Sequence, residues 1–300
     1  MKHIKEEQNI TVIGKNIKIG DKVIFGENIK IIAEEIIIRN NVSFGSNIDI
    51  HIKGKFSIDE YSRLGDNTYI RGNNASFGKH LFNSAGLRIG GGGRQHPNAN
   101  FSIGDRCTIH NNFINVCEPV IIGNDVGLSP EVTILTHGYW LSALNGFPAK
   151  FAGVKIDDGV IAGYRSLILM GVHIGKNAVI AAQSVVTKDL AGDAIYAGNP
   201  AKKIIDVIEP SIKEKIKLLN KIIVEYKKIA KYHNINPKIR VNYPFVHVND
   251  CIFNVESFEF EGNEDKETDD FRDYVRKWGL RFFSKRPFKS HFTFYNDIIK

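Results

Sequence analysis

Cysteine, methionine and tryptophan are scarce in this chain of 300 residues, with three, two and two copies respectively. Cys107, Cys117 and Cys251 are an odd number and lack the close spacing of a metal site. This pattern argues against a disulfide framework and favours a reduced, cytoplasmic protein. No apolar run approaches the roughly 18 residues of a membrane span. The opening MKHIKEEQ carries charges where a signal peptide needs an apolar segment, so we expect no leader.

The charge is moderately basic. A formal net charge of +7 suits a polyanionic ligand, such as a phosphorylated cofactor or nucleic acid. The lysines are spread along the chain rather than clustered, which is equally typical of a soluble surface. We therefore expect no nucleic-acid partner, and contact with a membrane surface is the less favoured reading.

Apolar residues recur every six positions along much of the chain. This period fits neither a helix of 3.6 residues per turn nor a two-faced strand, but it fits a short strand followed by a tight corner. Three such units form a coil of about 18 residues, and coils stack about 4.8 Å apart as parallel strands. The clearest run is Ile156, Ala162, Ile168, Ile174, Ile180 and Val186; others pass through 103–134, with a one-residue slip after Asn115, and through 13–70.

The repeat predicts a mainly β protein, a parallel β-helix over residues 1–205. Within one stack, Ile156 should pair with Ile174, Ala162 with Ile180, and Ile168 with Val186. Residues 71–101 and 136–155 break the period and are predicted to be loops that leave the coil. Residues 206–234 contain apolar positions at helical spacing and predict an amphipathic helix, suited to capping the final coil. Residues 235–300 predict a small α+β appendage.

Several short motifs between Ile103 and Ile204 resemble one enzyme family. They are Thr136-His137 opening a long loop, the run 171–175 (GVHIG), the run 184–189 (SVVTKD) and the run 197–202 (AGNPAK). In this order they are similar to the hexapeptide-repeat acyltransferases of the galactoside, maltose and xenobiotic acetyltransferase group. The resemblance implies a left-handed coil, a homotrimer, acetyl-CoA as cosubstrate, no metal, and a carbohydrate hydroxyl as acceptor.

The resemblance also implies roles for individual residues. His137 matches the general base, and an imidazole titrating near neutrality suits that task. On the acceptor side the matching positions are His110, Asn112 and Glu118, although the sequence is one residue shorter than the family pattern there. The cofactor-binding positions are Gly163, Tyr164, Ala181, Ala182, Lys188, Lys202 and Lys203, with the lysines near the nucleotide phosphates.

The glycine run Gly90–Gly93 lacks the strand–turn–helix setting of a phosphate-binding loop. A surface loop is the simpler interpretation, although Arg88, Arg94 and His96 could contact an anionic sugar or phosphate.

Four alternatives stay open. N-acetylation of a nucleotide-linked amino sugar would use the same base and cofactor. A carbonic-anhydrase-like zinc site lacks the required pair of histidines five residues apart. A cysteine acyl-enzyme lacks a cysteine close to His137 in the sequence. A non-catalytic β-helix scaffold would not need a histidine that opens a long loop. The favoured reading is an acetyl-CoA-dependent O-acetyltransferase acting on a bacterial surface polysaccharide, capsule or lipopolysaccharide unit.

Overall fold

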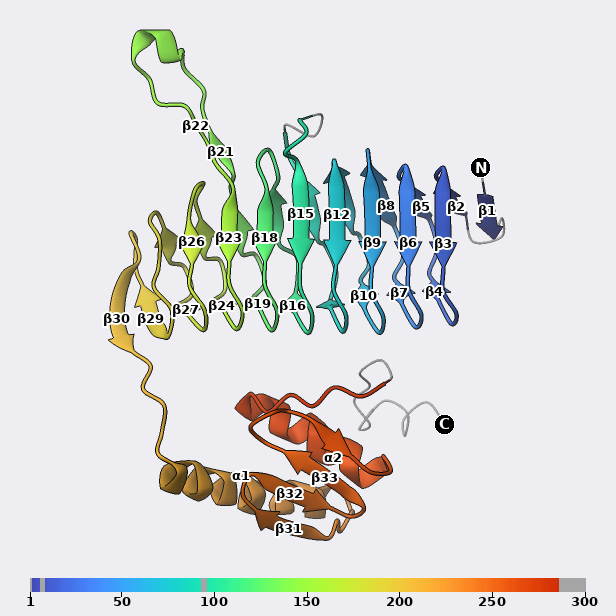
Figure 1. Ribbon diagram of the computed structural model, residues 1–300, viewed down its shortest axis with the longest axis vertical. Helices are drawn as coiled ribbons and strands as arrows, with labels where there is room; N and C mark the ends of the chain where they lie inside the picture. Colours follow the sequence, from blue (N-terminus) through green and yellow to red (C-terminus); the bar gives the residue numbers. More distant parts are fainter. Residues whose placement is uncertain (1, 6–8, 93–95, 286–300) are drawn as a thin grey trace. The chain divides into compact units, whose positions relative to one another are not determined.

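The computed structural model describes residues 2–5, 9–92 and 96–285. The chain divides into two compact units, Met1–Val207 (unit 1) and Ile208–Lys300 (unit 2). Unit 1 is the parallel β-helix that the repeat predicts, built from three sheets that we name A, B and C (Figure 1). Each coil contributes one short strand to each sheet in turn, so neighbouring strands come from successive coils.

The strands of each sheet follow the stacking order of the coils. Sheet A contains β1 (Lys2–Lys5), β2 (Ile10–Ile13), β5 (Ile29–Ile32), β8 (Ile48–Ile52), β11 (Tyr69–Gly72), β14 (Arg88–Gly90), β17 (Phe113–Asn115), β20 (Thr133–Ile134), β25 (Leu167–Ile168) and β28 (Val185–Val186). Sheet B contains β3 (Asn16–Ile19), β6 (Glu35–Ile38), β9 (Lys55–Ile58), β12 (Asn74–Phe77), β15 (Asn100–Ile103), β18 (Val120–Ile122), β23 (Val154–Ile156) and β26 (His173–Ile174). Sheet C contains β4 (Ile24–Phe25), β7 (Ser43–Phe44), β10 (Arg63–Leu64), β13 (Phe82–Asn83), β16 (Thr108–Ile109), β19 (Gly127–Leu128), β24 (Ile161–Ala162), β27 (Val179–Ile180), β29 (Ala194–Ala197) and β30 (Lys202–Asp206).

The predicted register is confirmed in the last coils. Ile156 pairs with Ile174, Ala162 with Ile180, and Ile168 with Val186. All six side chains are buried in one continuous apolar core. The early coils are longer than predicted: Ile10 pairs with Ile29, so that coil takes 19 residues. The extra residue at a corner explains why a strict six-residue count loses phase along the chain.

The loop predicted at 71–101 is wrong for most of its length. Strands β12, β13 and β14 continue the coil through this region. The pattern was obscured because Asn83 lies buried at an inward position. Its Oδ1 accepts from Gly65 N at 2.9 Å, and its Nδ2 donates to His110 O at 2.9 Å, so the buried amide joins three coils. Strands β14 and β15 pair with β11 and β12 of the preceding coil, so the coil continues through residues 88–90 and 100–103.

The loop predicted at 136–155 is confirmed. It is a hairpin of β21 (His137–Gly138) and β22 (Lys150–Phe151) with the short helix η2 (Ala143–Asn145) at its tip, and it projects from the coil (Figure 1). Its tip is apolar yet open, since Trp140 and Leu144 are 89% and 98% exposed.

Unit 2 contains the predicted helix and the predicted appendage as one body. Its elements are α1 (Ile212–Tyr232), β31 (Ile239–Asn242), β32 (Phe245–Val248), β33 (Cys251–Asn254), β34 (Phe260–Glu261), α2 (Lys266–Val275) and η3 (Arg276–Trp278), the strands forming one antiparallel sheet. The apolar face of α1, including Leu219 and Tyr226, packs in one cluster with Phe253 and Phe271 of the appendage. The helix predicted at 206–234 and the appendage predicted at 235–300 therefore share one core.

No helix among the described residues is both long enough and apolar enough to cross a membrane.

Candidate active site

His137 lies where the chain leaves sheet A for the projecting hairpin. Its half-buried imidazole places Nδ1 2.8 Å from Oδ1 of Asn115, and Phe151 stacks on the ring from the paired strand at 6.0 Å between centroids. An amide oxygen can only accept, so this contact requires the proton on Nδ1. In the neutral ring the lone pair is then on Nε2, which is the arrangement a general base needs.

Asn115 is the residue that fixes this arrangement. Its side chain is buried, and its Nδ2 donates to Gly90 O at 3.1 Å and to Gly91 O at 2.8 Å. Two carbonyl acceptors settle which end of the amide is nitrogen, so Oδ1 must face Thr136 and His137. Thr136 Oγ1 donates to the same oxygen at 2.5 Å. Sequence reasoning passed over Asn115, although a polar residue at a step of the apolar repeat was the available signal.

The glycine run is part of the same site. Gly90, Gly91 and Gly92 have φ values of 140°, 85° and 124°, which side-chain-bearing residues rarely adopt. A Cβ at Gly91 would lie 2.9 Å from the Phe113 ring, and one at Gly92 would lie 3.5 Å from His137 Cε1. The run thus lets the backbone pass close to Asn115 and to the imidazole. Gly93 and Arg94 lie outside the described residues.

Glu118 lies at the same corner between sheets A and B as His137, on the neighbouring coil. Its backbone N–H donates to Thr136 Oγ1 at 3.2 Å, and its carboxylate accepts from Asn98 Nδ2 at 3.0 Å. Cys117 is beside it, with its N–H directed at Asn115 Oδ1 at 3.3 Å. Burial, followed by the nearby Glu118 charge, raises the pKa of the Cys117 thiol, which disfavours the thiolate form. The stacking of coils therefore brings Cys117, which sequence distance had excluded, onto the same Asn115 oxygen that His137 contacts, while the raised pKa disfavours its reactive thiolate.

His110 and Asn112, the other predicted acceptor residues, lie at a different corner, between sheets C and A. Asn112 is buried; its Oδ1 accepts from His110 N at 2.8 Å and its Nδ2 donates to Ser129 O at 2.8 Å. The His110 ring has its Nδ1 2.9 Å from Ser84 Oγ, and burial lowers its pKa. Both side chains are engaged in closing the coil, and within one chain they do not join His137.

Four predicted cofactor residues stack at that same C-to-A corner in later coils. Gly163 and Tyr164 follow β24, and Ala181 and Ala182 follow β27. A Cβ at Gly163 would lie 2.6 Å from Ala182 N, so the two corners are in direct contact. Tyr164 is partly exposed and donates its hydroxyl to Glu131 Oε1 at 3.2 Å.

The predicted lysines are divided between two places. Lys188 is exposed at the A-to-B corner that follows β28, on the same edge of the coil as His137. Lys202 and Lys203 are exposed on β30, the last strand of sheet C, where Lys203 pairs with Asp206 at 2.9 Å.

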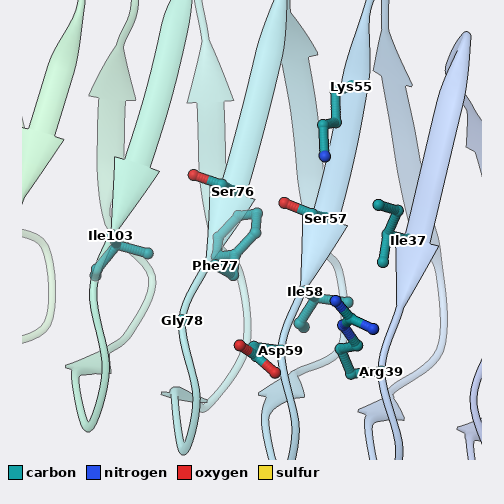
Figure 2. A pocket seen from close by; sticks show the side chains of 10 residues that line it. All are labelled: Ile37, Arg39, Lys55, Ser57, Ile58, Asp59, Ser76, Phe77, Gly78 and Ile103. Carbon is teal, nitrogen blue, oxygen red and sulfur yellow. The ribbon is translucent and has the colours of Figure 1, made fainter.

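No group of three or more His, Cys, Asp or Glu side chains within 2–5, 9–92 and 96–285 could hold a metal ion. The hollow in Figure 2, of about 290 Å³, lies on sheet B over β6, β9 and β12, away from the coil that carries His137. It includes exposed Arg39 and Lys55 but none of the predicted site residues.

Comparisons with known proteins bear on this arrangement. No protein-family model matches the chain. YJL218W of Saccharomyces cerevisiae, provisionally named an acetyltransferase, is 37% identical over 115 residues, which are 37% of this chain and 58% of that protein. A 2,3,4,5-tetrahydropyridine-2,6-dicarboxylate N-acetyltransferase of Staphylococcus aureus is 38% identical over 77 residues, 25% of this chain and 32% of that one. Part of this chain is therefore similar to acetyltransferases. It spans less than two thirds of the length of these relatives.

Two solved acetyltransferase structures each match part of the chain with a low TM-score. The hexapeptide-repeat acetyltransferase VCA0836 from Vibrio cholerae matches with a TM-score of 0.39 and 24% identity, over 44% of this chain and 73% of that one. A maltose O-acetyltransferase from Clostridium difficile 630 matches with a TM-score of 0.31 and 23% identity, over 68% of this chain and 73% of that one.

Proposed function

We propose that this chain is a hexapeptide-repeat acyltransferase that moves an acetyl group from acetyl-CoA to a hydroxyl group of a carbohydrate. The observation that carries the proposal is the Asn115–His137 contact, which leaves imidazole Nε2 as a base at the foot of an open hairpin. The sequence similarity to acetyltransferases supports the reaction class.

His137 acts as the general base in this scheme. Its Nε2 takes the proton of the acceptor hydroxyl as that oxygen attacks the thioester carbonyl carbon, forming the new C–O bond. The tetrahedral intermediate then expels the CoA thiolate, which recovers the proton from the imidazolium. Asn115 Oδ1 holds Nδ1–H throughout and stabilises the charged ring without taking its proton.

Acetyl-CoA binds in a groove shared by two copies of the chain in a homotrimer. The partition of the predicted residues supports this: His137 and Lys188 lie on one edge of the coil, and Gly163, Tyr164, Ala181 and Ala182 on another. A groove between two copies of the chain, lined by one of these edges from each copy, would bring the two groups of residues together. Lys202 and Lys203 would then supply positive charge for the nucleotide phosphates.

The acceptor is a sugar hydroxyl of a bacterial surface polysaccharide, capsule or lipopolysaccharide. N-acetylation of a nucleotide-linked amino sugar is the second candidate, favoured by the similarity to an N-acetyltransferase of Staphylococcus aureus. The same base and thioester would serve an amine as well as a hydroxyl.

One assay tests the proposal. The purified chain is incubated with acetyl-CoA and a panel of sugars, amino sugars, nucleotide sugars and oligosaccharides, and released thiol is measured. Acetyl transfer to a hydroxyl, lowered about 100-fold or more by His137→Ala, is the expected result. Transfer only to amines would replace the O-acetyl proposal with the N-acetyl one, and a fully active His137→Ala variant would refute the assigned base.

A further inference from the structure

A row of outward-facing side chains crosses sheet A, starting beside the glycine run and leading toward the amino-terminal coils. Strand register places its members on consecutive strands, about 4.8 Å apart. We call Lys30, Asp49, Tyr69, Arg88 and Phe113 the sheet A row.

The row begins at the candidate active site. Phe113 pairs with Arg88 on one side and with Thr133, on the strand that leads to His137, on the other. Arg88 is two residues before Gly90, whose carbonyl accepts from Asn115. Two strand spacings, about 10 Å, therefore separate Arg88 from the strand that leads to the imidazole.

The charge of the row is positive. Asp49 is the one acid, and it forms an ion pair with Arg71. Lys30 and Arg88 are exposed, and within the described residues neither forms an ion pair. Both cations are thus available to an anion from solution.

Arg71 also prepares the aromatic part of the row. It is nearly buried, donates to Asp49 O at 2.8 Å, and places its guanidinium carbon 4.0 Å from the centre of the Tyr69 ring. Arg88 approaches the same ring at 6.0 Å. Tyr69 is thereby held by a fixed cation on its own strand, with a second, free guanidinium beside it.

This chemistry fits an acidic sugar chain. Tyr69 and Phe113 are half-buried, so each leaves part of its ring open to the face of a sugar. An exposed guanidinium such as that of Arg88 can bind a carboxylate through two parallel hydrogen bonds. The row ends at a hollow of about 320 Å³ whose lining includes Lys30 and Asp49, which leaves room for more than one sugar unit.

We infer that the acceptor is an anionic polysaccharide that lies along the sheet A row, with a carboxylate on Arg88 while a neighbouring sugar presents its hydroxyl to His137. This inference rests on the proposed acetyltransferase function and names the class of its acceptor.

The test compares acidic oligosaccharides with their own neutral forms. The probes are oligogalacturonate, hyaluronan oligomers and oligosialic acid, each alongside its carboxyl-reduced counterpart, measured for acetyl transfer and for equilibrium binding. The variants are Arg88→Gln, Arg88→Lys and the matched control Arg63→Gln, which removes an exposed arginine from sheet C on a neighbouring coil.

We expect wild type to prefer at least one acidic probe over its reduced form by tenfold or more. Arg88→Gln should lower kcat/KM for that probe about 10-fold, chiefly through KM, and abolish the preference, because one charge-assisted pair is lost. Arg88→Lys should recover part of the effect, since it keeps the charge but loses the paired geometry. Arg63→Gln should behave as wild type.

The two proposals fail in different ways. If wild type acetylates acidic and reduced probes equally, or Arg88→Gln affects both forms alike, the inference is wrong and the acetyltransferase proposal stands. If no probe is acetylated but acidic probes bind wild type and not Arg88→Gln, the row is an anionic-glycan site and the enzyme proposal fails. Absence of both transfer and binding overturns the inference.

Discussion

Replacing Asn115 by leucine tests whether this buried amide positions the imidazole of His137, the proposed general base. Leucine has nearly the same shape but neither donates nor accepts. The change removes the contact with His137 Nδ1, the bonds from Thr136 Oγ1 and Cys117 N, and the two bonds to Gly90 O and Gly91 O. The substitution therefore removes the hydrogen bonds of the Asn115 side chain while keeping its packing nearly unchanged.

The cost in stability follows from the partners left behind. Gly90 O keeps a bond from Val116 N at 3.3 Å, and Thr136 Oγ1 keeps its bond to Asn115 O at 3.2 Å, so neither is fully orphaned. At about 1 kcal/mol net for each lost bond, we expect the free energy of unfolding to fall by about 2–4 kcal/mol. Denaturant unfolding of the purified variant measures this.

The fall in kcat should be larger than the loss of the His137 hydrogen bond alone would produce. Without Oδ1, nothing selects the Nδ1–H tautomer, and one hydrogen bond of about 1 kcal/mol corresponds to roughly fivefold in population. Misorientation of the ring adds up to about 10²-fold. We therefore expect kcat to fall between about 5- and 100-fold, with little change in the dissociation constant of CoA.

A double-mutant cycle and a control variant make the test decisive. In a His137→Ala background, Asn115→Leu should slow the reaction no further than about twofold, because the amide acts through the imidazole. Asn112→Leu is the matched control: it removes an equally buried amide on the same coil that contacts only backbone groups. It should lower stability and leave kcat near wild type. Multiplicative effects of the Asn115 and His137 changes, or a kcat loss in the control equal to that of Asn115→Leu, would refute the positioning role.

Three further predictions follow from the structure. Cys117→Ser should keep activity within about twofold, because the raised pKa disfavours the thiolate; an acetylated Cys117 in quenched wild-type reactions would contradict this. Burial lowers the pKa of His110, so the unfolded chain binds more protons on acidification, and stability should fall as the pH drops from about 7 toward 5. His110→Gln should flatten that dependence in unfolding titrations, and an unchanged slope would exclude His110 as its source. Truncation after Val207 should leave a folded β-helix, as measured by circular dichroism. Truncation after Asn234 should give a protein that aggregates, because it exposes the buried face of α1. Two equally soluble products would show that α1 does not need the rest of unit 2 to cover it.

The sequence predicted the β-helix because every coil of a solenoid repeats the same spacing of apolar residues, and this spacing can be seen directly in the sequence. The pairs from Ile156 to Val186 were predictable to the residue, since each coil there has the same length and an apolar inward position. The prediction failed over 71–101, where a buried asparagine and longer coils broke the count. An amide satisfied across three coils can replace an apolar side chain, and that exchange is invisible in a pattern of hydrophobicity.

The candidate active site was predictable only in part, because most of its residues come from different coils. His137 was named from its motif and Glu118 from alignment, and both lie at one corner of the coil. Asn115, Cys117 and the glycine run join His137 from earlier coils, about 20 to 47 positions before it in the chain. Coil stacking brings residues that are distant in the sequence within hydrogen-bonding distance, and a short sequence motif contains no information about these contacts.

The sequence alone thus determined the coil, its inward faces and the histidine that opens the hairpin, because these depend on period and on local residue type. The tertiary structure decided which nitrogen of His137 is free, which amides are engaged in closing the coil, and that both cations of the sheet A row are open to solvent. Those properties depend on distances between residues of different coils, and strand stacking fixes these distances only after the whole coil has formed.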